Sequence, residues 1–167
     1  MYDPLGLSIG TTNLVAARDG FPPVTRRAVL HVSAQQPAVL GSVPHGSGSA
    51  ITGFVDRVGD SAPLIGADGT AHEPDLLLVQ AIDALIAATG AQPATTQLMI
   101  AIPAYWGARQ ARALRDALHG HPELARSGAP AGLVSDAAAA LTTVDAGPGL
   151  PSQGAVVLCD FGGGGRS

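Results

Sequence analysis

The residues best suited to chemistry form a short turn near the start of the chain, Gly10-Thr11-Thr12-Asn13. Apolar residues on both sides, 5–9 and 14–17, predict two strands joined as a β-hairpin. One glycine, two hydroxyls and an amide offer backbone N–H groups and small donors to an anion, and a phosphate can approach such a backbone closely. Threonine and asparagine also suit turns for purely local reasons, which is the structural alternative.

A second run of glycines follows the last apolar segment. Residues 155–159 predict a strand, and Asp160-Phe161-Gly162-Gly163-Gly164-Gly165 comes directly after it. Cys159 is the single cysteine, so no disulfide can form within the chain, and we expect a small core residue there rather than a catalytic thiol. The triplet Asp160-Phe161-Gly162 is also found in protein kinases, but the chain has no lysine and its order of elements differs from theirs.

Composition limits the classes of protein that the chain can represent. Its 167 residues are enough for one domain with a real core, and 46% of them are hydrophobic while only 13% are charged. The formal net charge of −4 argues against a nucleic-acid-binding protein. All nine basic residues are arginine, which excludes the P-loop kinases and their phosphate-binding lysine. Without a signal peptide or an apolar run of about 20 residues, we expect a soluble, cytoplasmic domain.

The first half of the chain predicts mostly short strands. Residues 24–32 alternate well enough for a third strand, which would complete a three-stranded meander. The stretch 33–50 is rich in Gly, Ser, Pro and Gln and predicts an irregular surface loop or short strands. Further on, residues 63–70 predict a small hairpin that turns at Asp68-Gly69.

The second half alternates helices and strands. Pro74 opens a helix that is apolar on both broad faces and ends at Gly90. The later elements are a strand over 96–102, a helix over 107–119, a strand over 131–134, a helix over 136–144 capped by Ser135, and a linker over 147–151. Local strands followed by strands delivered through crossover helices predict an α/β fold, in which a mixed sheet is flanked by helices.

Two charged clusters of the second half have both a surface and a binding interpretation. In the helix over 107–119, Arg109, Arg112 and Arg115 crowd one face, which indicates a solvated surface more than an anion site. His119 and His121 flank Gly120, with Glu123 as the nearest acid. Two histidines and one acid make a weak metal site, so we expect them to be exposed loop residues.

Four segments in the right order resemble the nucleotide-binding domain of Hsp70 (DnaK-type) chaperones, of the actin, Hsp70 and sugar-kinase superfamily. Residues 6–13 look like the first phosphate loop, and 157–164 look like the second. The segment Ala101-Ile102-Pro103-Ala104-Tyr105-Trp106 is similar to the family's Val-Pro-Ala-Tyr-Phe, and 136–141 to its Glu-Pro-Thr-Ala-Ala-Ala-Leu. Residues 53–60 resemble the stretch Phe-Lys-Arg-Arg-Val-Gly-Asp, so the resemblance covers nearly the whole chain.

This resemblance implies an actin-like ATPase (ribonuclease H-like) lobe. Residues 1–150 would form lobe I, with a shortened insertion at about 33–72. Residues 151–167 would be a linker with the first strand and phosphate loop of an otherwise missing lobe II. In the family, ATP or ADP with Mg²⁺ lies between the lobes, so we expect a fragment of a longer protein that binds nucleotide weakly or not at all by itself.

The resemblance also implies the site residues. Gly10, Thr11, Thr12 and Asn13 would contact phosphate, as would Gly162, Gly163 and Gly164. Thr11, Asp136 and Asp160 would take part in catalysis, with Asp160 contacting the metal through a water. The family's metal-organising Asp is here Ser8, its water-positioning Lys aligns with Val55, and the threonine that ends the second loop is replaced by Gly165. Ser8 has no negative charge with which to hold Mg²⁺.

These departures predict a degenerate ATPase that acts as a nucleotide-responsive binding module. Two alternatives remain: an active ATP-dependent chaperone ATPase or kinase that uses Arg57 in place of the lysine, and a structural or interaction module that keeps only the fold. A protein client or partner would bind through the missing regions. The unpaired strand at 155–159 could also pair with a second molecule, because exposed strand edges associate.

Overall fold

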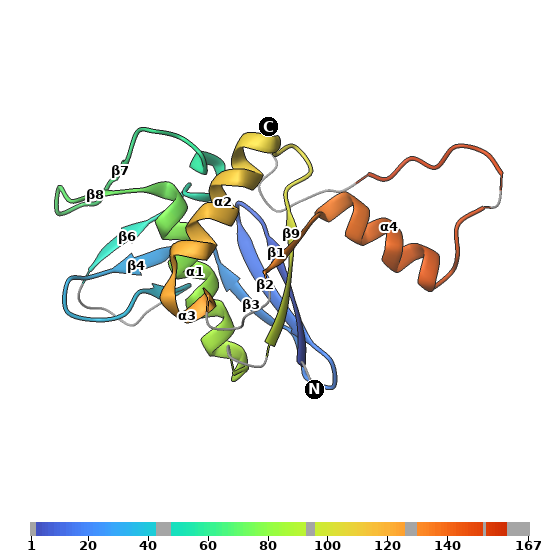
Figure 1. Ribbon diagram of the computed structural model, residues 1–167, viewed down its shortest axis with the longest axis horizontal. Helices are drawn as coiled ribbons and strands as arrows, with labels where there is room; N and C mark the ends of the chain where they lie inside the picture. The colour runs from blue at the N-terminus through green and yellow to red at the C-terminus, as the bar shows by residue number, and fades with distance from the viewer. Residues whose placement is uncertain (1–2, 43–47, 93–95, 126–129, 152, 160–167) are drawn as a thin grey trace.

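The computed structural model describes residues 3–42, 48–92, 96–125, 130–151 and 153–159 (Figure 1). Its main sheet has five strands in the order β10-β9-β1-β2-β3. β1 (Asp3–Ile9), β2 (Asn13–Arg18) and β3 (Val24–Arg27) are antiparallel neighbours, while β9 (Thr96–Ile102) runs parallel to both β1 and β10 (Gly132–Ser135). The predicted mixed sheet, a meander plus parallel strands, is confirmed.

Alternation along β1 decides which face of the sheet meets the core. Leu5, Leu7 and Ile9 are at most 3% exposed, whereas Gly6 and Ser8 between them are exposed. The buried face packs against α1 (Pro74–Thr89), whose Leu78, Ile82 and Leu85 are fully buried. The helix ends where predicted, because Gly90 takes the left-handed conformation with φ 69° that only glycine adopts without strain.

Two further long helices differ in how they are packed. α2 (Ala108–Gly120) lies beside α1 in Figure 1, buries Leu114 and Leu118, and turns its arginines to solvent as predicted. It includes Gly120, one residue beyond the expected end, and is followed by the short α3 (Pro122–Ala125). α4 (Asp136–Ala146) buries no residue and projects from the body in Figure 1. Its N-cap is Ser135 as predicted, whose Oγ accepts the N–H of Ala138 at 3.1 Å.

The predicted strand over 24–32 is divided between two sheets. After β3 the chain bends at Ala28 and Val29, where the N–H of Val29 bonds to the carbonyl of Arg27 at 2.8 Å. β4 (Leu30–Val32) then leaves the main sheet and pairs with β5 (Val39–Leu40) and β6 (Ser49–Ile51). The bend lets Ala28 and Leu30 both enter the core, and β5 and β6 are the short strands expected in 33–50.

The small hairpin is confirmed. β7 (Leu64–Ile65) pairs with β8 (Ala71–His72), and the turn between them has Gly69 at φ 82°. Before it lies a 3₁₀ helix, η1 (Val55–Arg57). Two residues after η1, the N–H of Gly59 donates to Asp75 Oδ1 of α1 at 2.7 Å. This bond holds the segment 53–60 against the helical layer.

The prediction for residues 155–159 is wrong. The structure gives these residues no strand, because no strand among the described residues bonds to them, and Cys159 is exposed rather than part of the core. Val157 is 82% exposed, and Val156 and Leu158 also face solvent. The apolar run therefore buries little surface here. Within the part of the chain that the structure describes, no helix is long and apolar enough to cross a membrane.

Candidate functional site

The candidate site lies at the edge of the sheet where three parallel strands end. Ser8 of β1 is opposite Ala101 of β9, and Ile102 of β9 is opposite Ser135 of β10. The carboxyl ends of β1, β9 and β10 therefore meet at one edge. In open α/β sheets, ligands bind at such an edge, beyond the ends of the strands.

The turn after β1 is closed by its own backbone. The N–H of Gly10 bonds to the carbonyl of Asn13 at 3.1 Å, and the N–H of Ala28 bonds to the carbonyl of Thr12 at 2.8 Å, which ties the turn to the end of β3. A Cβ on Gly10 would lie 2.8 Å from the carbonyl oxygen of Asn13, so the turn requires glycine. Thr11 and Thr12 are partly exposed and Asn13 is exposed, so their polar groups are open to a ligand.

Asp136 stands at the same edge and connects two strands. It follows β10, and its Oδ1 accepts the N–H of Ala137 at 2.7 Å and the N–H of Ala104 at 2.9 Å. Ala104 comes just after β9, so this carboxylate fixes the segment after β9 to the start of α4. The second carboxylate oxygen of Asp136 makes no hydrogen bond to a described residue.

Two of the three departures from the Hsp70 pattern, Ser8 and Val55, lie among the described residues and occupy different surroundings. Ser8 is exposed on the face of the sheet opposite α1, next to the turn. Val55 is 1% exposed and belongs to the hydrophobic core, so its side chain cannot reach a ligand at the edge. Arg57 is committed to its own loop: its Nε lies 2.6 Å from Asp60 Oδ2, and its Nη2 donates to the carbonyl of Ala62 at 3.3 Å.

Tyr105 and Asp56 were not among the predicted site residues. The hydroxyl of Tyr105, after β9, donates to Asp56 Oδ1 at 2.8 Å and so joins η1 to the edge that carries Asp136. Desolvation of the hydroxyl, together with the hydrogen bond and charge of Asp56, raises the pKa of Tyr105 to about 12. The two residues are 49 positions apart, so no local pattern in the sequence could have revealed the pair.

Removing this hydrogen bond is expected to have a measurable but modest effect. Folding raises the pKa of Tyr105, so the protonated hydroxyl and its bond to Asp56 stabilise the folded state. This stabilisation is complete below about pH 10, where the pKa of an ordinary tyrosine lies, and is lost as the pH rises through about 12. At pH 7, Tyr105→Phe should lower the free energy of unfolding by about 0.5 kcal/mol, since the pair is exposed. Ultraviolet titration of the phenol in a Tyr2→Phe background should show a midpoint near 12 that Asp56→Asn lowers; an unchanged midpoint would contradict the assignment.

Part of the predicted site lies outside the described residues. The structure does not describe Asp160, Gly162, Gly163 and Gly164, so the second phosphate loop stays a prediction. Among the residues that are described, no group of three or more His, Cys, Asp or Glu side chains is placed to hold a metal ion.

Comparisons with known proteins give a match at the level of structure. No family model matches the chain, and no curated protein matches it. Among solved structures, MreB5 of Spiroplasma citri, crystallised with ADP, superimposes with a TM-score of 0.51 over 88% of this chain at 13% identity. The chain has the actin-like ATPase fold. It spans 41% of the length of MreB5.

The actin-like ATPase fold explains the layout of the site. The meander β1-β2-β3 supplies the phosphate-loop candidate, and the two parallel strands β9 and β10 bring Tyr105 and Asp136 to the same edge. At 13% identity the superposition establishes the fold of the chain and not its activity.

Proposed function

We propose that this chain is an N-terminal fragment of an Hsp70-like nucleotide-binding domain, with residues 1–150 as its lobe I. The observation that carries the proposal is the glycine-closed turn Gly10–Asn13 at the carboxyl edge of the parallel strands of an actin-like ATPase fold. The ADP in the MreB5 structure supports a nucleotide as the ligand. The order of the four Hsp70-like segments supports this family over its superfamily neighbours. ATP or ADP would bind with its phosphates at this turn.

The donors at the edge fit a phosphate better than a bare divalent cation. The turn offers partly exposed threonines and a backbone free of bulky side chains, which suits an anion. Mg²⁺ prefers oxygen ligands and carboxylates. Here Ser8 is neutral, and one oxygen of Asp136 already accepts two amides. Mg²⁺ would neutralise phosphate charge in the complex, with Asp160 contacting it through a water.

Slow hydrolysis follows from the same residues. Loss of one group that stabilises transition-state charge often costs a few kcal/mol. Val55 is buried where the family has its lysine, and the guanidinium of Arg57 is bound to Asp60 and Ala62. Arg57 is therefore poorly placed to replace the lysine, which favours a degenerate ATPase over an active one.

The proposal is tested by nucleotide titration of the full natural protein. Thermal shift with ATP, ADP and phosphate in the presence of Mg²⁺ should show saturable stabilisation, and single-turnover assays should show little hydrolysis. Absence of binding by all three ligands would favour a module that keeps only the fold. Turnover like that of an ordinary Hsp70, lost in Arg57→Ala, would favour the active ATPase.

Self-association through the exposed apolar run is a separate proposal. Val156, Val157 and Leu158 are 47%, 82% and 37% exposed, and adjacent exposed apolar residues favour association. Sedimentation velocity of the 167-residue chain should show a concentration-dependent shift to larger species, which Val157→Asp abolishes. The conservative control Val157→Thr should reduce the shift less. Monomers of the unaltered chain at all concentrations would contradict the proposal.

A further inference from the structure

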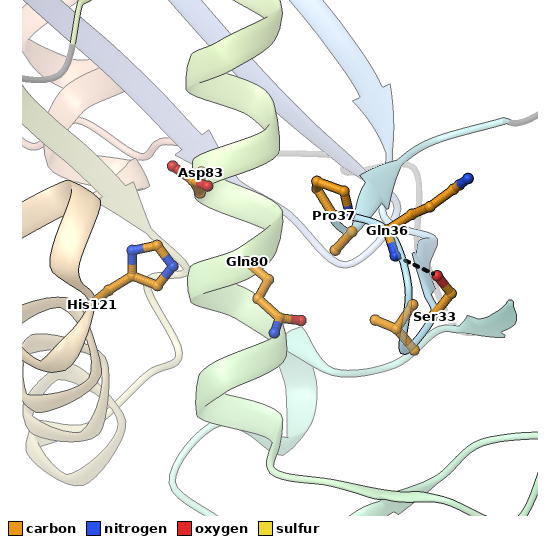
Figure 2. Close-up of a pocket in the computed structure, with 8 residues that line it drawn as sticks. Ser33, Gln36, Pro37, Gln80, Asp83 and His121 are labelled. Carbon is orange, nitrogen blue, oxygen red and sulfur yellow. Dashed lines mark hydrogen bonds between the residues drawn. The ribbon is translucent and has the colours of Figure 1, made fainter.

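We propose that a pocket on the outer side of α1 binds a small primary amine. The pocket has a volume of about 270 Å³ and is formed by three separate parts of the chain: the stretch after β4, the middle of α1, and His121 between α2 and α3 (Figure 2). None of its residues belongs to the turn Gly10–Asn13 or to the Asp136 cluster. A ligand here would therefore occupy a second site.

Three polar side chains of this pocket have groups without a protein partner among the described residues. The carboxylate of Asp83 and the amide of Gln80 make no hydrogen bond or ion pair with any residue that the structure describes. His121 was expected to be an exposed loop residue, but it is partly buried, and its Nδ1 is enclosed without a hydrogen-bond partner. In Figure 2 the ring of His121 lies on one side of α1 and Ser33, Gln36 and Pro37 lie on the other, with Gln80 and Asp83 on α1 between them. An enclosed polar atom without a partner is unfavourable.

The groups present favour a cation with N–H donors. Asp83 supplies a negative charge, and Gln80 supplies an amide oxygen. The hydroxyl oxygen of Ser33, which already accepts the N–H of Gln36 at 3.1 Å, has a second acceptor site. Among the residues that the structure describes, no arginine lines the pocket, so an anion would meet the charge of Asp83 without compensation. An ammonium group has three donors and no acceptor, which matches this set.

The remaining lining sets the size and character of the ligand. Val32, Pro37 and Ala38 form an apolar wall of the pocket, against which a short aliphatic chain can pack. Pockets for drug-sized ligands hold roughly 300–1,000 Å³, so this pocket suits a smaller molecule. A primary amine on a short alkyl chain combines the charge that Asp83 favours with the apolar contact that the wall offers.

The test compares three probes that share one alkyl chain: n-butylamine, n-butanol and butyrate. Each is titrated into the full natural protein at neutral pH without nucleotide, while the amide resonances of residues 33, 80, 83 and 121 are followed by NMR. We expect saturable shifts with n-butylamine, affinity about tenfold lower for n-butanol, and no saturation with butyrate. Because no nucleotide is present, the outcome is independent of the proposed nucleotide site.

Matched variants separate this pocket from general charge effects. Asp83→Asn keeps the shape of the side chain and should weaken n-butylamine binding about tenfold. Asp116→Asn removes a carboxylate that also has no partner among the described residues, on the exposed face of α2 outside the pocket, and should leave the affinity unchanged. Equal binding of n-butylamine and n-butanol, no saturable binding of n-butylamine, or an unaltered affinity in Asp83→Asn would each overturn the proposal.

Discussion

Replacing Gly10 by alanine is expected to lower the free energy of unfolding by about 1–3 kcal/mol and to weaken ATP binding at least tenfold. The added Cβ would lie 2.8 Å from the carbonyl oxygen of Asn13, which is backbone and cannot rotate away. Either the turn opens or the hydrogen bond between Gly10 and Asn13 breaks. Both changes disturb the N–H groups that we propose to contact phosphate.

The matched control for this variant is Gly6→Ala, on the same strand. A Cβ at Gly6 would meet only the carbonyl oxygen of Ala17, at 3.8 Å, which is ordinary contact. Chemical denaturation should therefore show a change within about 0.5 kcal/mol for Gly6→Ala, and ATP titration should show no change in affinity. Equal effects of the two substitutions would mean that the turn is not specifically closed by Gly10.

Replacing Ser8 by aspartate is expected to raise single-turnover ATP hydrolysis about tenfold or more, in a manner that requires Mg²⁺. Ser8 is exposed beside the turn, so a carboxylate can be placed there without entering the core. It would restore the negative charge that the Hsp70 pattern has at this position. The gain should remain well below the activity of an ordinary Hsp70, because Val55 still stands in the place of the lysine.

Ser8→Asn separates charge from size in this experiment, since asparagine has nearly the shape of aspartate without its charge. Hydrolysis and its Mg²⁺ dependence are measured for both variants with nucleotide binding as a reference. Equal rates in Ser8→Asp and Ser8→Asn would show that a missing charge at this position does not limit hydrolysis. ATP binding that fails in the unaltered protein would instead count against the nucleotide site itself.

The elements that depend on neighbouring residues were predictable. The β1–β2 hairpin follows from two apolar runs around a glycine turn, and β9 was expected over the same residues, 96–102, that the structure shows. Pro74, Gly90 and Ser135 mark helix ends because each satisfies a local backbone requirement. The alternation of strands and helices in the second half also predicted parallel strands, and hence that Asp136 would follow a strand of the same sheet.

The predictions that failed concern which segments become neighbours. Residues 24–32 and 155–159 both have the composition of strands, but the first is divided at Ala28 and the second has no strand beside it. Apolar alternation reports that a segment can pair and does not report whether a partner is present. The core position expected for Cys159 failed for the same reason, since its burial required that missing pairing.

The sequence by itself determined the local framework of this protein: the glycine turn after β1, the ends of α1, the cap of α4, and the mixed α/β order that leads to the actin-like ATPase fold. Only the tertiary structure decided the contacts across long separations. It buried Val55, joined Tyr105 to Asp56, bound Asp136 to Ala104, and enclosed Nδ1 of His121 near Asp83. The physical reason is that turns, caps and periodicity depend on torsions and residues within a few positions, whereas a site is assembled by packing between elements.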